Sequence, residues 1–194
     1  HELFFVQKND KSRLLEKILE EYRGSVLVFS RTKFGARKIT AGVRALKHLV
    51  AEIHSDRSLS QRREALDGFR NGKYRVLIAT DIAARGIDVK GIELVLNYDL
   101  PQNPEDYVHR IGRTGRAGGV GHAISFATSD QRRDVKGIER LIRATLPLSK
   151  LPELPPARRI EKISEVSEAH FGYGHRPVVR SHSSDNRGFR RPRR

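Results

Sequence analysis

The run Ser-Val-Leu-Val-Phe at residues 25–29, followed directly by Ser-Arg-Thr at 30–32, decides the fold class of this chain. An almost continuous apolar run of this length is typical of a parallel strand that is covered on both faces. Residues 75–79, Arg-Val-Leu-Ile-Ala, have the same character, and residues 94–97 give a third example. Because such strands need helices on both sides, the three runs predict an α/β domain.

Segments with helical spacing separate these strands. Asp10 stands where it can cap a helix that ends at Gly24, and Thr32 precedes a second helix. The second helix is expected to continue to Leu46, and its inward-facing candidates are Phe34, Ile39, Val43 and Leu46. Three further helices are expected at 60–69, 104–110 and 130–146, and three further strands at 3–6, 49–53 and 122–126. This alternation predicts a three-layer α/β/α arrangement around a mainly parallel sheet, with right-handed crossovers.

Polar stretches follow the predicted strands directly, at residues 30–32, 54–57, 80–88 and from 99 onward. The carboxyl ends of parallel strands meet at one edge of the sheet, and α/β proteins bind their ligands there. We therefore expect the functional residues to lie along this edge.

The charge of the chain restricts its partners. Its 194 residues carry a formal net charge of +15 with a pI near 10.6, which favours polyanions and above all nucleic acid. The absence of cysteine excludes disulfides and cysteine-ligated metals, and no metal-binding pattern is present. No apolar run approaches the roughly 20 residues of a membrane span, and no signal peptide is visible. A cytoplasmic protein without membrane contact is expected, and its oligomeric state stays open.

The composition changes along the chain and predicts three parts. Residues 1–146 form the folded domain, residues 147–173 a proline-rich, charged connector, and residues 174–194 an arginine-rich tail. The tail contains no leucine or isoleucine and is expected to be disordered. Phe189 in the tail, with Phe171 and Tyr173 just before it, could stack on bases while the arginines follow the backbone of a nucleic acid. The alternative is a solubilising tail that interacts weakly. The candidate nucleic-acid contacts in the tail are Arg187, Arg190 and Arg191.

The most informative motif is Tyr-Val-His-Arg-Ile-Gly-Arg-Thr-Gly-Arg-Ala-Gly at residues 107–118. If its first half is helical, His109 and Arg113 lie four residues apart on one face. Arg116 follows Arg113 at a further turn, so two guanidinium groups can reach one target together. Guanidinium pairs bidentately with phosphate oxygens, which makes this motif a candidate polyphosphate site. The alternative is a solvated basic loop.

A second motif, Ala-Thr-Asp-Ile-Ala-Ala-Arg-Gly-Ile-Asp-Val, occupies residues 79–89 and follows a buried strand. Thr80 stands at the strand end, where its hydroxyl can donate to a phosphate oxygen. Asp88 is an acceptor suited to sugar hydroxyls. Asp81 is either a helix cap or a functional carboxylate.

With these motifs, residues 26–118 closely resemble the C-terminal RecA-like domain of DEAD-box RNA helicases of superfamily two, in a bacterial form with a basic tail. Residues 26–32 resemble motif four of that family, 79–89 motif five, and 109–116 motif six. The resemblance extends over about the first 145 residues. The chain departs from the common family form at Ser55, where many members have glycine, and at Leu59, where many have glutamine.

The resemblance implies a role for individual residues. Arg113 and Arg116 would be arginine fingers that reach the γ-phosphate of ATP, with Gly86 and Asp88 also at the nucleotide, Asp88 at its ribose. His109 would contact a second domain when the two close. The residues that would face RNA phosphates are Thr32, Arg57 and Thr80. For Arg110, a ligand contact and a structural ion pair both stay open.

The chain lacks both a phosphate-binding loop of the form Gly-x-x-x-x-Gly-Lys-Ser/Thr and an Asp-Glu-Ala-Asp sequence. The resemblance therefore implies that ATP and Mg²⁺ are held mainly by a separate N-terminal RecA-like domain. We expect this chain alone to be inactive as an ATPase, and the intact helicase to couple ATP hydrolysis to RNA binding and local unwinding. Two alternatives stay open: a stand-alone RNA-binding or adaptor protein that kept the fold without the motor, and a DNA helicase of the same superfamily.

Overall fold

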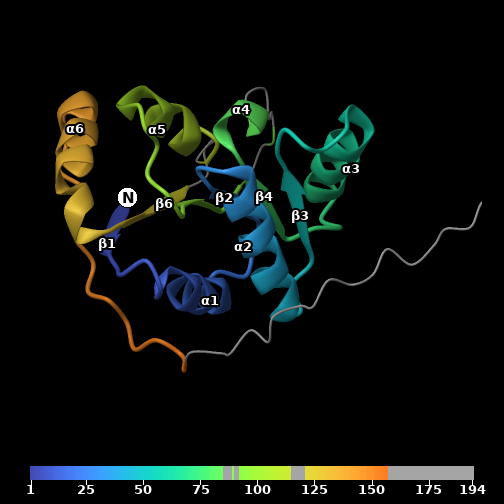
Figure 1. The fold of residues 1–194 in the computed structure, drawn as a ribbon, viewed down its shortest axis with the longest axis horizontal. Helices are drawn as coiled ribbons and strands as arrows, with labels where there is room; N and C mark the ends of the chain where they lie inside the picture. Colours follow the sequence, from blue (N-terminus) through green and yellow to red (C-terminus); the bar gives the residue numbers. More distant parts are fainter. Residues whose placement is uncertain (85–88, 90–91, 115–120, 157–194) are drawn as a thin grey trace, which may run out of the picture. The chain divides into compact units, whose positions relative to one another are not determined.

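The computed structural model describes residues 1–84, 89, 92–114 and 121–156. Its centre is a six-stranded sheet in which each pair of neighbouring strands is parallel, in the order β1-β6-β5-β2-β4-β3 (Figure 1). The strands are β1 (Glu2–Phe5), β2 (Val26–Phe29), β3 (Val50–Ile53), β4 (Val76–Ala79), β5 (Leu94–Asn97) and β6 (His122–Ala127).

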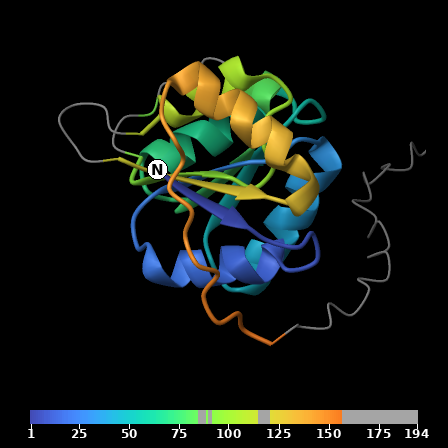
Figure 2. The same ribbon diagram turned by 90° about the vertical axis from the view of Figure 1, so that its left-hand side faces the viewer.

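Helices cover both faces of the sheet. One face carries α1 (Lys11–Glu21) and α2 (Lys33–Ala45). The other carries α3 (Leu59–Arg70), α4 (Asp81–Ala84), α5 (Pro104–Ile111) and α6 (Arg132–Ile142). Figure 2 shows α1, in blue, and α6, in orange, on opposite sides of the strands. The predicted three-layer α/β/α fold is confirmed.

The central strand β2 shows why its sequence is apolar throughout. Val26 and Val28 pack in the core under α1 and α2, whereas Leu27 and Phe29 pack in the core under α3 and α4. All four side chains are buried because successive side chains of a strand point to opposite faces.

Local sequence signals set several helix ends. Ser58 and Gln61 form a reciprocal capping box at the start of α3, which begins at Leu59, one residue before the expected start at Ser60. The hydroxyl of Thr32 accepts a hydrogen bond of 3.0 Å from the backbone N–H of Gly35 and so caps α2, the helix that was expected to follow this residue. Gly72 turns the chain between α3 and β4 with a φ of 75°, a conformation that favours glycine.

Three local expectations were wrong. Phe34 is 68% exposed, because the buried stripe of α2 runs through Ala36, Ile39, Thr40 and Val43 and leaves residue 34 on the other side. Asp10 makes no capping hydrogen bond; its carboxylate pairs with Arg13 at 2.8 Å instead. The last helix is shorter than residues 130–146, because a short 3-10 turn precedes it and Arg143 ends it in a left-handed conformation.

The chain after α6 returns to the sheet. The N–H of Leu3 donates to the carbonyl of Pro147 at 2.8 Å, and the N–H of Ser149 donates to the carbonyl of Leu3 at 2.9 Å. Leu148 forms a parallel bridge with Leu3, so residues 147–149 lie along the outer edge of β1. The part boundaries at 146 and 173 stay predictions. Among the described residues, no helix is both long and apolar enough to cross a bilayer.

Candidate functional site

The carboxyl ends of three neighbouring strands meet at one edge of the sheet. The N–H of Ser30, after β2, donates to the carbonyl of Ala79 at the end of β4 at 2.9 Å. The N–H of Thr80, after β4, donates to the carbonyl of Ile53 at the end of β3 at 3.2 Å. The polar residues that follow these strands therefore share the strand-end edge that the sequence predicts.

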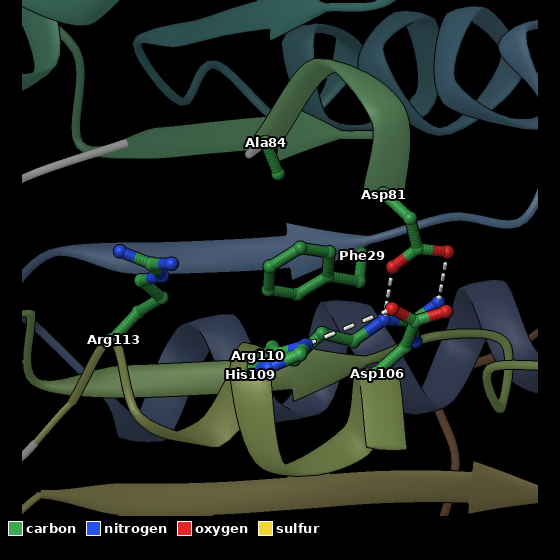
Figure 3. A pocket seen from close by; sticks show the side chains of 7 residues that line it. All are labelled: Phe29, Asp81, Ala84, Asp106, His109, Arg110 and Arg113. Atoms are coloured by element: carbon green, nitrogen blue, oxygen red, sulfur yellow. Dashed lines mark hydrogen bonds and ion pairs between the residues drawn. The ribbon is translucent and has the colours of Figure 1, made fainter. Parts of the chain in front are cut away.

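A cavity of about 220 Å³ opens at this edge between the end of β2, α4 and α5 (Figure 3). Two acids, a histidine and two arginines give it a polar lining with no large excess of either charge. The residues around it are Phe29, Asp81, Ala84, Asp106, His109, Arg110 and Arg113.

Arg110 forms the rigid side of this cavity. Its side chain is only 2% exposed, and Nε and Nη2 donate to the two carboxylate oxygens of Asp81 at 2.6 and 2.7 Å. Nη1 donates to Oδ1 of Asn97 at 2.9 Å and to the carbonyl of Asp99 at 2.7 Å. The guanidinium also lies 4.9 Å from the ring centre of Phe29. Of the two roles that stay open in the sequence, the structure shows the structural ion pair.

Arg113 is placed differently. It follows α5 directly, is half-buried and lines the cavity. Figure 3 shows its guanidinium across the ring of Phe29 from the pair that Arg110 forms with Asp81. His109 is more open still: its side chain is 74% exposed, and Nδ1 lies 3.8 Å from Oδ1 of Asp106. The end of α5 therefore places the exposed His109 directly before the buried Arg110, and the half-buried Arg113 follows the helix.

The second half of the edge joins the start of α2 to the loop after β3. One carboxylate, Asp56, accepts from Nζ of Lys33 at 2.9 Å and from Nη2 of Arg37 at 2.6 Å. The hydrogen bond from Lys33, helped by the charges of Lys33 and Arg37, lowers the pKa of Asp56 below its ordinary value. Thr32 lies at the end of α2 that this carboxylate anchors.

Arg57, in the same loop, pairs with the carboxylate of Glu52, which is 9% exposed. Burial alone raises the pKa of Glu52, but the hydrogen bond and charge of Arg57, together with the neighbouring Thr40 and His54, outweigh it and lower the pKa. His54, fully buried, accepts from the N–H of Asp56 at Nδ1, which leaves the ring proton on Nε2, 3.6 Å from Oε1 of Glu52. Arg57 is thus an arginine that already has a carboxylate partner.

The structure describes only part of the predicted site. Arg113, His109, Thr32, Arg57 and Thr80 lie on the strand-end edge, and Thr80 is 9% exposed. The predicted site residues that lie outside the described part of the chain are Gly86, Asp88, Arg116, Arg187, Arg190 and Arg191. Within the described part, no group of three or more histidine and acidic side chains could hold a metal ion.

Sequence reasoning missed the partners of the charged residues. Asp81 and Arg110 both stood in the quoted motifs, but nothing in the sequence indicated that the two motifs join through this pair. Asn97 and Asp99, at the end of β5, complete it and gave no signal beyond their place after a strand. Asp56 lies next to Arg57, the residue expected to bind phosphate, and it anchors two cations from another segment.

Comparison with known proteins identifies the family. A family model described as the helicase conserved C-terminal domain matches residues 10–118. The ATP-dependent RNA helicase RhlB of Cronobacter sakazakii (strain ATCC BAA-894) is 40% identical over 168 residues, which cover 83% of this chain and 40% of that protein. The chain spans less than half the length of such curated relatives.

Solved structures agree with this match. The C-terminal domain of the DEAD-box protein Dbp5 is 32% identical with a TM-score of 0.70, over 76% of this chain and 87% of that chain. S. cerevisiae Dbp5 bound to RNA and ADP BeF3 is 31% identical with a TM-score of 0.71, over 77% of this chain and 41% of that chain. The chain belongs to the DEAD-box RNA helicases and corresponds to their helicase C-terminal domain.

Proposed function

We propose that this chain acts with an N-terminal RecA-like domain as an ATP-dependent RNA helicase, which couples ATP binding and hydrolysis to RNA binding and local unwinding. The observation that carries the proposal is the placement of Arg113 at the cavity beside the Arg110–Asp81 pair. Arg113 lines the cavity, while Arg110, three residues earlier, is fixed in the fold. Such an arrangement suits a cation that completes a nucleotide site held by another domain.

The cavity fits one part of a nucleotide site. Its volume of about 220 Å³ is smaller than the roughly 300–1,000 Å³ typical of pockets that enclose a ligand. The sequence has no phosphate-binding loop, so ATP and its Mg²⁺ would be held mainly by the N-terminal domain. Bound ATP supplies a phosphoanhydride bond whose cleavage drives the cycle. Arg113 and Arg116 would neutralise charge that develops on the transferred phosphoryl group. Gly86 and Asp88 would contact the nucleotide, Asp88 at its ribose.

The Arg110–Asp81 pair would hold α5, and with it Arg113, in a fixed position at the cavity. Asp81 begins α4 and Arg110 belongs to α5, so their two hydrogen bonds fix the two segments to each other. His109, exposed on the same helix, is available for the N-terminal domain. A preorganised cation stabilises developing charge better than one that must reorganise during the reaction.

RNA would lie along the other half of the edge, with its phosphates at Thr32, Arg57 and Thr80. The relative Dbp5 has been solved bound to RNA. Arg57 would contact a phosphate while Glu52 holds the rest of its guanidinium in place. The tail residues Arg187, Arg190 and Arg191 would add contacts that weaken steeply with salt. A cytoplasmic location stays a prediction.

Complementation in trans tests the proposal. This chain alone is expected to show no RNA-stimulated ATPase activity, and adding a separate N-terminal helicase domain is expected to restore it. Arg113→Lys keeps the charge but removes the planar guanidinium, and should lower the restored turnover by about 10³-fold or more. The matched control is Arg133→Lys, an exposed arginine on α6 that should leave turnover unchanged. Equal loss in both variants, or ATPase activity of the chain alone, contradicts the proposal.

A further inference from the structure

Within the part of the chain that the structure describes, Phe34 is an exposed aromatic residue whose exposure the fold itself does not explain. It lies in the first turn of α2, two residues after the capping Thr32, and 68% of it is exposed. Burying a phenylalanine would stabilise the fold by roughly 1.5–3 kcal/mol, and this ring contributes little of that. A single exposed apolar residue is common in proteins, so exposure alone assigns no role. The surroundings of the ring decide the question.

Two cations frame the ring on one side. Nζ of Lys33 lies 5.4 Å from the ring centre, and the guanidinium carbon of Arg37 lies 6.0 Å from it. Both side chains bind the carboxylate oxygens of Asp56, which gathers them on one side of the ring. The ring therefore has two cations beside it and keeps open surface.

The ring lies beside residues that are proposed to contact RNA phosphates. Thr32 and Arg57, the two neighbouring candidates for phosphate contact, lie in the same segments as the ring and its anchoring carboxylate. A strand whose phosphates lie at these residues would pass the first turn of α2, where the ring stands. An aromatic face beside fixed cations is the combination that binds unpaired bases of any sequence.

We propose that Phe34 is a stacking platform for an unpaired base of the RNA strand bound at the strand-end edge. The proposal deepens the proposed function and rests on it, because it requires RNA at this edge. It assigns to this chain a base contact in addition to phosphate contacts. Lys33 and Arg37 hold the ring and face the adjoining phosphates, and the ring adds affinity that does not depend on charge.

The test uses the whole 194-residue chain and two fluorescent probes, a ten-nucleotide oligoadenylate and a strand of the same length that lacks bases. Phe34→Ala should weaken oligoadenylate binding on the order of tenfold, the range of one lost base stack. The loss should be the same at every salt concentration, because stacking releases no counterions. Binding of the base-free strand should not change, and Phe34→Trp should retain the native affinity for oligoadenylate.

Leu49→Ala is the matched control. Leu49 is 63% exposed and lies just before β3, at the amino-terminal ends of the strands. Its truncation to alanine, far from the strand-end edge, should leave both affinities unchanged. If the native chain and Phe34→Ala bind oligoadenylate equally well, the stacking proposal is overturned while the proposed function stands. The ring would then be open to a protein partner. An equal loss for both strands also overturns the stacking proposal, because the ring then acts through the phosphate contacts. If the native chain binds neither strand, the proposed RNA edge and the platform both fail.

Discussion

Two arginine–carboxylate pairs of equal length lie at the two halves of the strand-end edge. Arg110 meets Asp81 at 2.6 Å, and Arg37 meets Asp56 at 2.6 Å. The side chains of the first pair are 2% and 26% exposed, whereas those of the second are 47% and 32% exposed. The same chemical contact therefore occurs once with its cation inside the fold and once with its cation in water.

Burial decides what each pair can do. Arg110 is buried, so its guanidinium has lost its hydrogen bonds to water. Hydrogen bonds to Asp81, Asn97 and the carbonyl of Asp99 replace them, and Arg110 is therefore not available to bind a ligand. Arg37 loses little when it exchanges Asp56 for water or a phosphate, because exposed pairs contribute little to stability. The half of the edge around Arg110 is therefore rigid, and the pair at Arg37 is exchangeable.

The largest expected effect comes from breaking the buried pair. Arg110→Met should lower the free energy of unfolding by about 3–5 kcal/mol, because it leaves the carboxylate of Asp81 without its partner beside a buried amide. Urea denaturation of the whole chain measures the change. Arg113→Met is the matched control, since this half-buried arginine should contribute less than about 1 kcal/mol. If the two variants lose equal stability, burial is not what distinguishes these arginines.

A double variant sharpens this result. Asp81→Asn combined with Arg110→Met removes both charges, and should be more stable than Arg110→Met alone because no unpaired carboxylate is left. Suppose instead that Asp81→Asn lowers stability by the same amount in Arg110→Met as in the native chain. The two residues would then act independently.

A smaller effect is expected at Glu52. Its pair with Arg57 joins a buried carboxylate to a partly exposed arginine, and so lies between the buried pair at Arg110 and the exposed pair at Arg37. The pKa of Glu52 is lower in the folded chain than the ordinary value of 4.5, so its ionised form stabilises the fold above that pH. This contribution is lost as the pH falls below 4.5 and through the folded pKa. Glu52→Gln should therefore flatten the fall in stability below pH 4.5, measured by urea denaturation at a series of pH values. If stability falls as steeply below pH 4.5 in Glu52→Gln as in the native chain, Arg57 does not stabilise the ionised carboxylate.

The smallest effect is expected at Asp56. Asp56→Asn should leave the unfolding midpoint almost unchanged, because the carboxylate and its two cations are exposed. It should strengthen RNA binding a few-fold and steepen the salt dependence, because two cations lose a competing anion. Fluorescence anisotropy at several salt concentrations measures both. Weaker binding would show that Asp56 serves mainly to position Lys33 and Arg37.

The sequence predicts the parts of the fold that depend on local pattern. The six strands and their common edge were predictable because fully buried parallel strands leave long apolar runs, as at residues 25–29. The phase of a helix is harder to predict: α2 buries Ala36 and Thr40, two residues that carry little hydrophobic signal, and so Phe34 was placed inside.

Pairing across the fold could not be predicted in the same way. Asp81 and Arg110 are 29 residues apart, and their contact depends on how α4 and α5 pack over β2 and β5. For Arg110 the sequence therefore permitted two roles, and only the three-dimensional arrangement shows the ion pair. The roles of Gly86, Asp88 and Arg116 stay predictions, because these residues lie outside the described part of the chain.

The segment at residues 147–149 has a consequence for handling this domain in isolation. It shields the outermost strand, β1, whose backbone groups would otherwise offer a template for another chain. A protein truncated after Leu146 would lose this segment and expose the unpaired border of β1. Such a truncation should be more prone to self-association through added strands than the same domain ending ten residues later.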